Sequence, residues 1–463
     1  MKLNYFNFKK IGDKILLTND FGRFHFVDEK EMKSIIKRDV DLDSELGKSL
    51  LQKGFIYSES NLGFSSKNKY PLQSLKGYVQ TATSLHIFVV TTACNANCRY
   101  CQANNGKKSS NLFMSKEVAQ KAVNIALESP LQNLSFEFQG GEPLNNFDII
   151  RFIVEYSEAH KGNHKIEYSV VSNLSLLSEE MIAFFQKYHF NISTSVDGPK
   201  EVHNFNRPFQ TGIGTFDLTL SGINRIRKAG LNIGAIQTTT KPALAFPVET
   251  IKTYKGMGFS SIFIRPLTPL GKAACQWDEI GYSPEEFLVF YRKAMDTLIE
   301  MNIEGEHIRE NHAAILLQKM RGYMVNYMEL RSPCGAAFGQ MAYYPDGKIF
   351  TCDEGRMLYE MGDDIFCLGN VFTDHYQDLI SSSTCKVVCA ASTLETIPTC
   401  CDCVYQPYCG TCPVINYAGN KDVIEKEPRG YRCKIYSGIL DYLFEKYLQG
   451  DKKVLAILEE WSN

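Results

Sequence analysis

The stretch TTACNANCRYCQA, residues Thr91–Ala103, places Cys94, Cys98 and Cys101 in a C-x3-C-x2-C array directly after a predicted strand. In a parallel α/β fold this is the C-terminal mouth of the sheet, where loops converge on a site. Three thiolates on one short loop can hold three irons of a [4Fe–4S] cube and leave the fourth iron open to a substrate or cofactor. A structural zinc loop or buried cysteines are the alternatives, but zinc usually pairs C-x2-C with a distant second pair and needs a fourth ligand.

Around this loop the chain alternates short β-rich runs with amphipathic helical stretches, which is typical of βα units on a parallel sheet. The predicted strands are Leu85–Thr91, Leu134–Phe138, Ile166–Val171, Ile192–Val196, Asn232–Thr238 and Ser261–Arg265. The helices between them are predicted near Ser115–Glu128, Phe147–His160, Ser178–Tyr188, Thr215–Ala229 and Pro247–Met257. Six such units are fewer than the eight of a closed barrel, so we expect an α/β fold with an open, partial (β/α)6 barrel over residues 84–275.

The regions on either side of the barrel have different patterns. Residues 1–57 predict a small α/β unit, because two short apolar runs precede two stretches of helical periodicity. The strands are expected around Ile15–Thr18 and Phe24–Val27, and the helices over Glu29–Lys37 and Ser44–Lys53. Residues 58–83 are polar and predict a linker, and residues 276–330 predict a helical bridge that includes Pro284–Met301. In residues 331–463 the periodicity fades and cysteines dominate, which predicts a C-terminal cysteine-rich domain.

The net charge, the distribution of apolar residues and the number of cysteines exclude several classes of protein. The net charge is −2, from 50 basic and 52 acidic residues, so no overall attraction to nucleic acid or to an anionic membrane is expected. The first twenty residues lack an unbroken apolar run, and no stretch is long and apolar enough to span a bilayer. We therefore expect a soluble, cytoplasmic protein. Its 15 cysteines are grouped tightly in a large chain without a signal peptide, which favours metal ligation over disulfides.

The first cysteine array, with Tyr100 before its last member, resembles the cluster motif of the radical S-adenosylmethionine superfamily. The resemblance implies that the open iron takes the amino and carboxylate groups of S-adenosylmethionine, whose reductive cleavage yields a 5′-deoxyadenosyl radical. Other motifs fall at strand ends, where that family places its cofactor contacts: Gly140-Gly141-Glu142-Pro143, Ser172-Asn173, Ser195, Asp197 and Arg207. By resemblance, Glu142 would meet the cofactor's ammonium, the later strand ends its ribose and Arg207 its carboxylate. Each motif alone would also fit an ordinary loop.

The second cysteine group resembles the SPASM domain, which holds two auxiliary [4Fe–4S] clusters. It contains C-x12-G-x4-C from Cys334 through Gly347 to Cys352, followed by Cys400, Cys403, Cys409, Cys412 and Cys433. Carried over position by position, the outer cluster would take Cys400, Cys403, Cys409 and Cys433. The inner cluster would take Cys334, Cys352 and Cys412. Cys412 follows Cys409 after two residues instead of the usual three, and the fourth inner ligand stays open. A rubredoxin-like or double zinc-ribbon domain is the alternative.

Five cysteines remain outside these two sets: Cys275, Cys367, Cys385, Cys389 and Cys401. Cys275 is expected to be structural or incidental. The pair Cys385 and Cys389 could supply a ligand, form a redox pair or be buried thiols, and we favour the last.

The segments Ile262–Ala273, Leu330–Met357 and Cys403–Val414 look most like maturases of the His-Xaa-Ser peptide system. The resemblance implies a ribosomally made precursor peptide as substrate and an electron donor such as flavodoxin or ferredoxin, and it allows a second maturase as partner. Residues 1–57 resemble the winged-helix-like element by which many such enzymes bind a leader segment as an added strand, although a capping role fits equally. A sulfatase-activating enzyme would share all these motifs. A non-catalytic electron carrier would not need the barrel.

Asp353 is the candidate acid–base residue, because it directly follows the inner-cluster cysteine Cys352. Oxidising a substrate radical to a closed product releases an electron and usually a proton, and a nearby carboxylate can take that proton. In the resembling sulfatase-activating enzymes an aspartate at this place acts as base. Glu354 is the neighbour that could substitute, and Asp353 could instead only bond backbone amides of the loop.

Overall fold

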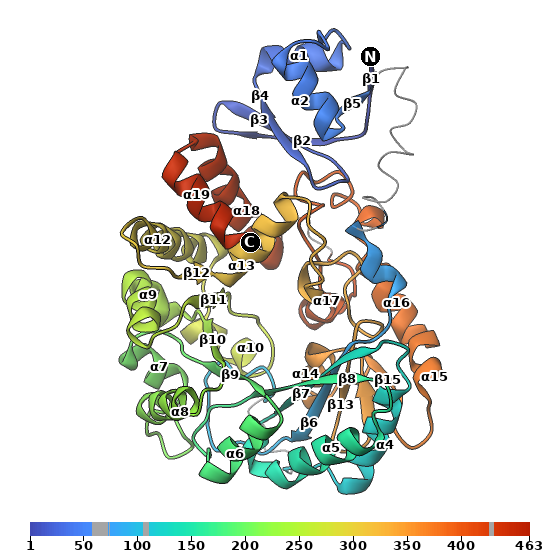
Figure 1. Cartoon of the computed structure of the whole chain (residues 1–463), viewed down its shortest axis with the longest axis vertical. Helices are drawn as coiled ribbons and strands as arrows, with labels where there is room; N and C mark the ends of the chain where they lie inside the picture. The colour runs from blue at the N-terminus through green and yellow to red at the C-terminus, as the bar shows by residue number, and fades with distance from the viewer. Residues whose placement is uncertain (58–72, 74, 105–110, 426–429) are drawn as a thin grey trace.

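A ten-stranded sheet forms the centre of the computed structural model, which describes residues 1–57, 73, 75–104, 111–425 and 430–463 (Figure 1). The strand order is β12-β11-β10-β9-β8-β7-β6-β13-β14-β15. Its parallel middle consists of β6 (Leu85–Thr91), β7 (Asn133–Gly140), β8 (Lys165–Val171), β9 (Asn191–Ser195), β10 (Ile233–Thr238) and β11 (Ser261–Arg265). These are the six strands that the sequence predicts, in chain order, so the partial barrel is confirmed.

Helices connect these strands and cover the outside of the barrel (Figure 1). The five predicted helices are α4 (Lys116–Leu127), α5 (Phe147–His160), α6 (Glu179–Lys187), α8 (Phe216–Lys228) and α9 (Pro247–Gly256). Ser115 and Ser178 cap α4 and α6 by accepting a hydrogen bond from a backbone N–H of the first turn. The short helix α7 (Lys200–Asn206) was not predicted, because seven residues are too few to show a clear helical period. Three 3-10 turns, η2 (Gly77–Gln80), η3 (Pro143–Asn146) and η4 (Lys241–Ala245), also belong to this half of the chain.

The cysteine-rich region adds three strands to the same sheet, which the sequence did not predict. They are β13 (Gln340–Tyr343), β14 (Lys348–Phe350) and β15 (Cys367–Asn370). β13 pairs with β6 in parallel, and β14 and β15 follow as antiparallel neighbours. All four residues of β13 are buried, so the strand lacks the alternation of polar and apolar residues that would have marked it. The cysteines of this region are therefore anchored to the barrel sheet itself.

Helices dominate the rest of the C-terminal half. The predicted bridge contains α11 (Trp277–Ile280), α12 (Pro284–Ile303), α13 (Asn311–Met320), the turn η5 (Met328–Leu330) and the two-residue strand β12 (Arg309–Glu310). Before it lies α10 (Lys272–Cys275). After it come α14 (Asp353–Glu360), α15 (Tyr376–Ser381), α16 (Ser383–Ala391), η6 (Leu394–Thr396), α17 (Pro413–Asn420), α18 (Tyr431–Gln449) and α19 (Lys452–Trp461). Among the described residues, no helix is long and apolar enough to cross a membrane.

The N-terminal unit lies at one end of the molecule, against the C-terminal helices (Figure 1). Its three-stranded sheet has the order β2-β3-β4, with strands Asn7–Ile11, Lys14–Thr18 and Phe24–Val27. The helices α1 (Glu29–Ile36) and α2 (Glu45–Lys53) complete it with the short pair β1 (Lys2–Leu3) and β5 (Ile56–Tyr57). Phe24 contacts the rings of Phe444 and Tyr447 on α18, so the unit shares an interface with that helix. Residues 58–72 and 74 of the predicted linker lie outside the described residues.

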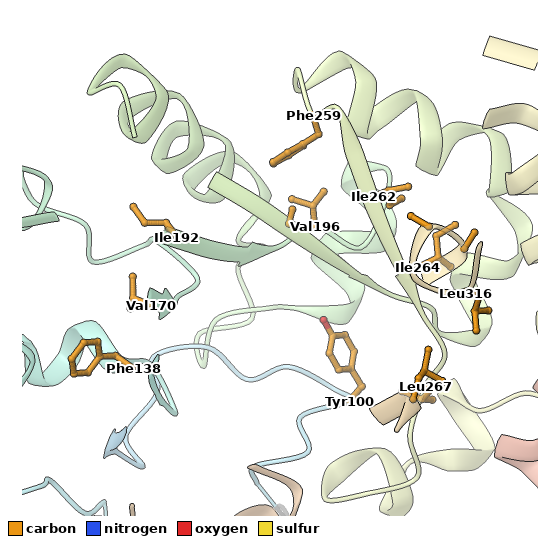
Figure 2. Packing of buried hydrophobic residues seen from close by; sticks show 14 of the residues in the cluster. Tyr100, Phe138, Val170, Ile192, Val196, Phe259, Ile262, Ile264, Leu267 and Leu316 are labelled. Carbon is orange, nitrogen blue, oxygen red and sulfur yellow. The ribbon is translucent and has the colours of Figure 1, made fainter. Parts of the chain in front are cut away.

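The strands β7 to β11 alternate buried and partly exposed residues, whereas β6 is buried on both faces, as expected for a central parallel strand. In β6 every residue after Leu85 is buried. Figure 2 shows buried apolar side chains of this core, among them Phe138 of β7, Val170 of β8, Ile192 of β9 and Ile264 of β11, with Tyr100 in the same cluster. The Cys94–Cys101 loop is therefore fixed to the core through the aromatic residue that precedes its last cysteine.

Candidate active site and cysteine centres

The loop with Cys94, Cys98 and Cys101 follows β6 and is held by the segment after α7. The N–H groups of Asn97 and Arg99 donate to the carbonyls of Pro208 (2.7 Å) and Asn206 (2.9 Å). The side chain of Gln210 donates to the carbonyl of Cys94 (2.7 Å). The three thiols are half-buried, and each is free of a disulfide. Burial and then the neighbouring Cys98 raise the pKa of Cys94 to about 12 and that of Cys101 to about 11.

A buried network anchors the same loop to the end of β9. The hydroxyl of Tyr100 donates to both carboxylate oxygens of Asp197 (2.9 Å each), and Arg207 donates to the Tyr100 hydroxyl (2.5 Å). Asp197 is fully buried and also accepts from the side chain of Asn206 (3.2 Å). The structure therefore brings three of the predicted site residues, Tyr100, Asp197 and Arg207, into direct contact.

Glu142 lies at the centre of a second cluster of predicted residues, at the ends of β7 and β8. Its buried carboxylate accepts hydrogen bonds from the Ser172 hydroxyl (2.7 Å), the Asn173 N–H (2.8 Å) and the Leu144 N–H (3.1 Å). A carboxylate has about four acceptor sites, so about one remains for a ligand. Asn173 in turn donates to the side chain of Asn95, beside Cys94 (2.9 Å). Ser195 ends β9 half-buried, and no contact with these two groups is seen for its side chain.

The turn Gly140-Gly141 packs against the backbone of Thr91–Ala93, at the start of the cysteine loop. The Gly141 N–H donates to the Thr91 carbonyl (2.8 Å), and the Glu142 N–H donates to the Ala93 carbonyl (2.9 Å). A Cβ on Gly141 would lie 2.5 Å from the Ala93 oxygen and 2.6 Å from the Thr92 oxygen. Both are backbone atoms, so a larger residue could be accommodated only if the loop moved.

We therefore expect Gly141→Ala to displace the cysteine loop and to destabilise the protein by about 1–3 kcal/mol, the usual cost of overpacking. Iron content of the reconstituted protein and the thermal midpoint should both fall. Gly234→Ala on β10 is the matched control, because its added Cβ meets no atom within 4 Å. Full iron content and an unchanged midpoint for Gly141→Ala would show that the turn does not support the loop.

The cysteines predicted for the outer cluster lie together. Cys400, Cys403 and Cys409 come from the loop before α17, and Cys433 comes from α18. Burial raises the pKa of Cys400 to about 12, and the charges of Cys409, Cys403 and Cys433 add to the shift. The Cys403 N–H donates to the Cys400 carbonyl (3.2 Å), so these two cysteines share one turn of the loop.

The three cysteines predicted for the inner cluster form a separate group. Cys334 and Cys352 are buried, and Cys412 packs against them in one small core with Leu270. The Sγ of Cys352 accepts the N–H of Gly355 at 3.4 Å, at the start of α14. Burial raises the pKa of Cys412 well above its usual range, with Glu354 and Cys334 adding. Cys334, Cys352 and Cys412 thus share one small core.

Five cysteines remain outside the three predicted sets. Cys385 and Cys389 occupy successive turns of α16 and share a side-chain hydrogen bond. Cys367 on β15 donates to the carbonyl of Gly369 (3.5 Å), and Cys401 donates to Asp402 (3.7 Å). Cys275 is exposed at the end of α10.

Two buried arginines beside the inner group fit negatively charged clusters. Arg331 is 1% exposed, and its Nε and Nη2 have no partner among the described residues. The Nε of Arg432 is likewise buried and without a partner in the described part of the chain. The charge of Arg331 acts on Cys334, and that of Arg432 acts on Cys334, Cys409 and Cys412. Sulfurs of iron–sulfur clusters accept such hydrogen bonds, whereas an unpaired buried N–H otherwise costs free energy.

A single bound metal ion is the alternative to a cluster at each cysteine group. In the described residues, no group of three Cys, His, Asp or Glu side chains is close enough to hold one metal ion. One zinc ion would need such a group, whereas each thiolate of a [4Fe–4S] cube binds a different iron. The donors in all three groups are cysteine thiols, which is compatible with iron–sulfur clusters.

The loop after β11 contacts both the Cys94–Cys101 loop and the inner cysteine group. The N–H of Lys272 donates to the carbonyl of Cys101 (2.9 Å), while Leu270 packs with Cys334 and Cys352. Gly271 has φ of 62°, and a Cβ there would lie 2.6 Å from the Cys101 oxygen. In the sequence, this segment stood out only for its family likeness, and its contact with both cysteine groups was not predicted. Gly271 could have indicated a close approach of the backbone, because glycine permits both a positive φ and such an approach.

Asp353 is the first residue of α14 and faces the ends of the barrel strands. Its carboxylate accepts from the Nε of Arg356 (2.7 Å), and the Nη2 of the same arginine donates to Gln139 on β7 (3.3 Å). Arg356 is almost fully buried, with its side chain 2% exposed, and that of Asp353 is 18% exposed. Asp353 thus lies between the inner cysteine group and the Gly140 turn.

Comparison with known proteins identifies the class. Residues 88–257 match the family model of the Radical SAM superfamily, so the chain contains a radical SAM domain and its cofactors include S-adenosylmethionine and a [4Fe–4S] cluster. The chain is also homologous to the anaerobic sulfatase-maturating enzymes. The cysteine-type enzyme of Clostridium perfringens is 26% identical over 277 residues, which cover 58% of this chain and 74% of that protein. An uncharacterized protein of Methanocaldococcus jannaschii, MJ0907, is 31% identical over 40% of this chain, and the match spans 63% of that relative.

Solved structures share the fold. The structure of anSMEcpe with bound AdoMet matches with a TM-score of 0.68 and 23% identity, covering 79% of this chain and 98% of that one. Streptococcus suis SuiB bound to precursor peptide SuiA matches with a TM-score of 0.54 and 14% identity, covering 91% of this chain and 97% of that one. Both likenesses establish the architecture, including the region beyond the barrel.

Proposed function

We propose that this enzyme binds three [4Fe–4S] clusters and modifies a ribosomally made precursor peptide. Cys94, Cys98 and Cys101 would hold the first cluster, and the outer and inner cysteine groups would hold the other two. When bound, the first cluster and S-adenosylmethionine supply the 5′-deoxyadenosyl radical that abstracts a hydrogen atom from the substrate. Residues 1–57 would be the recognition unit, 84–275 the barrel, 276–330 the helical bridge and 331–463 the auxiliary-cluster domain.

Side chains of this chain would bind and orient S-adenosylmethionine. Glu142, with its remaining acceptor site, would bind the ammonium, and Arg207, held against Tyr100, would supply positive charge for the carboxylate. The residues at the ends of β8 and β9, Ser172, Asn173 and Ser195, would contact the ribose. An external donor such as flavodoxin or ferredoxin would supply the electron.

The proposal of a peptide substrate is supported mainly by the N-terminal unit and its position in the fold. The SuiB structure, solved with a precursor peptide, covers 91% of this chain, whereas anSMEcpe covers 79%. The unit also contacts the outer-cluster loop: Asn7 donates to the Cys403 carbonyl (3.1 Å) and Thr18 to the Val404 carbonyl (2.7 Å). A leader segment bound there would lie beside a proposed auxiliary centre.

The sheet of this unit offers two edges for an added strand. Antiparallel neighbours alternate between hydrogen-bonded and non-hydrogen-bonded pairs. The two-residue turn between Ile11 and Lys14 therefore leaves the backbone groups of Phe8 and Lys10 directed away from β3. The same alternation leaves Phe24 and Phe26 directed outward on β4, where the Phe24 carbonyl accepts from Lys53 (3.0 Å). Phe8 is 61% exposed, an unusual place for a large apolar side chain.

We expect a precursor peptide to slow amide hydrogen exchange at every second residue of one of these edges. The reason is that an added strand bonds only the outward backbone groups. Residue-resolved exchange with and without the peptide measures this, and a peptide without its leader segment is the control. If the peptide protects the amides of neither edge from exchange, residues 1–57 have a structural role and do not bind the leader segment. Deleting residues 1–57 is a poorer test, because it would also remove contacts with the outer-cluster loop and α18.

Sulfatase activation is the second candidate, favoured by the homology to the Clostridium perfringens enzyme over 74% of its length. In that case the substrate would be one cysteine or serine of a sulfatase, oxidised to formylglycine. A peptide gene or a sulfatase gene beside this one would separate the two functions.

A further inference from the structure

The outer-cluster loop, residues 400–409, contains three of the four cysteines predicted for the outer cluster, but it forms neither a helix nor a strand. The structure describes all of its residues, which lie in turns between η6 and α17. Hydrogen bonds within the loop include those from the Cys403 N–H to the Cys400 carbonyl (3.2 Å) and from the Cys409 N–H to the Tyr405 carbonyl (3.1 Å). A segment without regular structure depends on neighbouring elements to hold its side chains in one arrangement.

Two strands of the N-terminal unit bond the backbone of this loop. The side chain of Asn7 on β2 donates to the Cys403 carbonyl (3.1 Å). The hydroxyl of Thr18, at the end of β3, donates to the Val404 carbonyl (2.7 Å). Thr18 is 0% exposed and Val404 is 4% exposed, so this second bond is shielded from water. A buried carbonyl that loses its donor costs free energy, because no water can replace the donor.

Lys9 joins the same loop to the helix that contains the fourth predicted cysteine, Cys433. Its ammonium donates to the Tyr405 hydroxyl (2.8 Å) and pairs with the carboxylate of Asp441 on α18 (2.8 Å). The Tyr405 hydroxyl itself donates to Asp441. Because α18 also contains Cys433, one lysine of the N-terminal unit contacts both elements from which the outer-cluster ligands would come.

The bond from Thr18 acts on a peptide group that also contacts a predicted ligand. The carbonyl of Val404 and the N–H of Tyr405 belong to this one peptide group, and the N–H donates to the Cys403 Sγ (3.5 Å). A peptide group is planar, and in its trans form the C=O and the N–H point in opposite directions. The Thr18 hydroxyl holds the carbonyl side of the group and thereby fixes the direction of the N–H toward the sulfur.

We propose that Thr18 is a positioning residue for the outer cluster, through the N–H···S bond that it orients. Hydrogen bonds to the sulfurs are among the factors that set the reduction potential of an iron–sulfur cluster. An N–H group stabilises the more negative, reduced cluster more than the oxidised one, so this bond should raise the potential. The inference rests on the proposed outer cluster, and it gives residues 1–57 a role that does not depend on leader binding.

The test uses the full chain with Cys94, Cys98 and Cys101 all replaced by alanine, so that only auxiliary clusters contribute. Anaerobically reconstituted protein should hold about eight irons, from two cubes. The two midpoint potentials are measured by redox titration followed by electron paramagnetic resonance. Thr18→Val removes the hydroxyl and keeps the shape of the side chain, whereas Thr18→Ser keeps the hydroxyl. Thr250→Val is the matched control, because the buried hydroxyl of Thr250 on α9 has no partner among the described residues.

We expect Thr18→Val to lower one of the two midpoint potentials and to leave the other unchanged. The equilibrium constant for one-electron reduction should fall by about twofold to tenfold, the net effect of one hydrogen bond, which corresponds to at most about 59 mV. Thr18→Ser and the control should keep both potentials. If Thr18→Val instead retains only about four irons, a return to about eight irons in Thr18→Ser supports the role of the hydroxyl.

Unchanged potentials in a fully clustered Thr18→Val, an equal fall of both potentials, or the same change in Thr18→Ser would overturn the role of Thr18. About four irons in the parent protein would instead contradict the proposal of two auxiliary clusters.

Discussion

Replacing Cys94, Cys98 and Cys101 together by alanine is expected to abolish 5′-deoxyadenosine formation and to remove about a third of the iron. The wild-type protein should hold about twelve irons after anaerobic reconstitution, because three cubes of four irons are proposed. The three thiols lie on one loop, whereas the other two cysteine groups lie in the C-terminal region. The substitutions should therefore leave the clusters of those two groups in place. Iron analysis and chromatography of the products after adding S-adenosylmethionine and a reductant measure both effects.

Cys275→Ala provides the control for this experiment. Cys275 is exposed at the end of α10 and lies outside the three cysteine groups, so its loss should leave iron content and product formation unchanged. Tightly bound zinc in place of iron, or 5′-deoxyadenosine from the triple variant, would contradict the assignment of the loop.

Asp353→Asn is expected to keep all three clusters and to yield 5′-deoxyadenosine, yet to form modified peptide at least about tenfold more slowly, because general acid–base catalysis usually contributes about 10²–10⁴-fold. After hydrogen abstraction, the substrate radical must lose an electron, proposed to enter an auxiliary cluster, and a proton. Asp353 lies between the inner cysteine group and β7, held by an arginine that also contacts Gln139. Mass spectrometry of the peptide over time measures the rate.

Arg356→Gln is the matched variant, because it breaks the same ion pair while leaving the Asp353 carboxylate. If Asp353 accepts the proton, the arginine variant should form product much faster than Asp353→Asn. Equal loss in both variants would assign the effect to the ion pair, and wild-type product formation by a fully clustered Asp353→Asn would show that Asp353 is not the base.

The barrel was predictable because short β-rich runs alternate regularly with amphipathic helices along the chain. For Leu85–Thr91 and Ser261–Arg265 the predicted and observed bounds are the same. The strands β13 to β15 were not predictable, because each has three or four residues and its pairing partner is far away in the sequence. Their place in the sheet depends on a contact with β6 that no local pattern encodes.

For the site, spacing and family likeness predicted how the cysteines divide into sets, and the structure packs Cys334, Cys352 and Cys412 of the inner set in one small core. The polar residues that support them could not be found in this way. Arg331 and Arg432 lie far apart in the sequence, and only the fold places both beside the inner group. The three hydrogen bonds that orient Glu142 likewise involve the ends of two different strands.

The most direct test of the proposed function follows hydrogen from the substrate. A candidate precursor peptide labelled with deuterium is incubated with reconstituted enzyme, S-adenosylmethionine and a reductant, in parallel with a deuterated sulfatase-derived peptide. We expect the precursor peptide to give 5′-deoxyadenosine that carries deuterium, together with a peptide of changed mass, because the radical takes its hydrogen from the peptide. Unlabelled 5′-deoxyadenosine and an unchanged precursor, with transfer only from the sulfatase-derived peptide, would contradict the peptide maturase and establish the sulfatase-activating alternative.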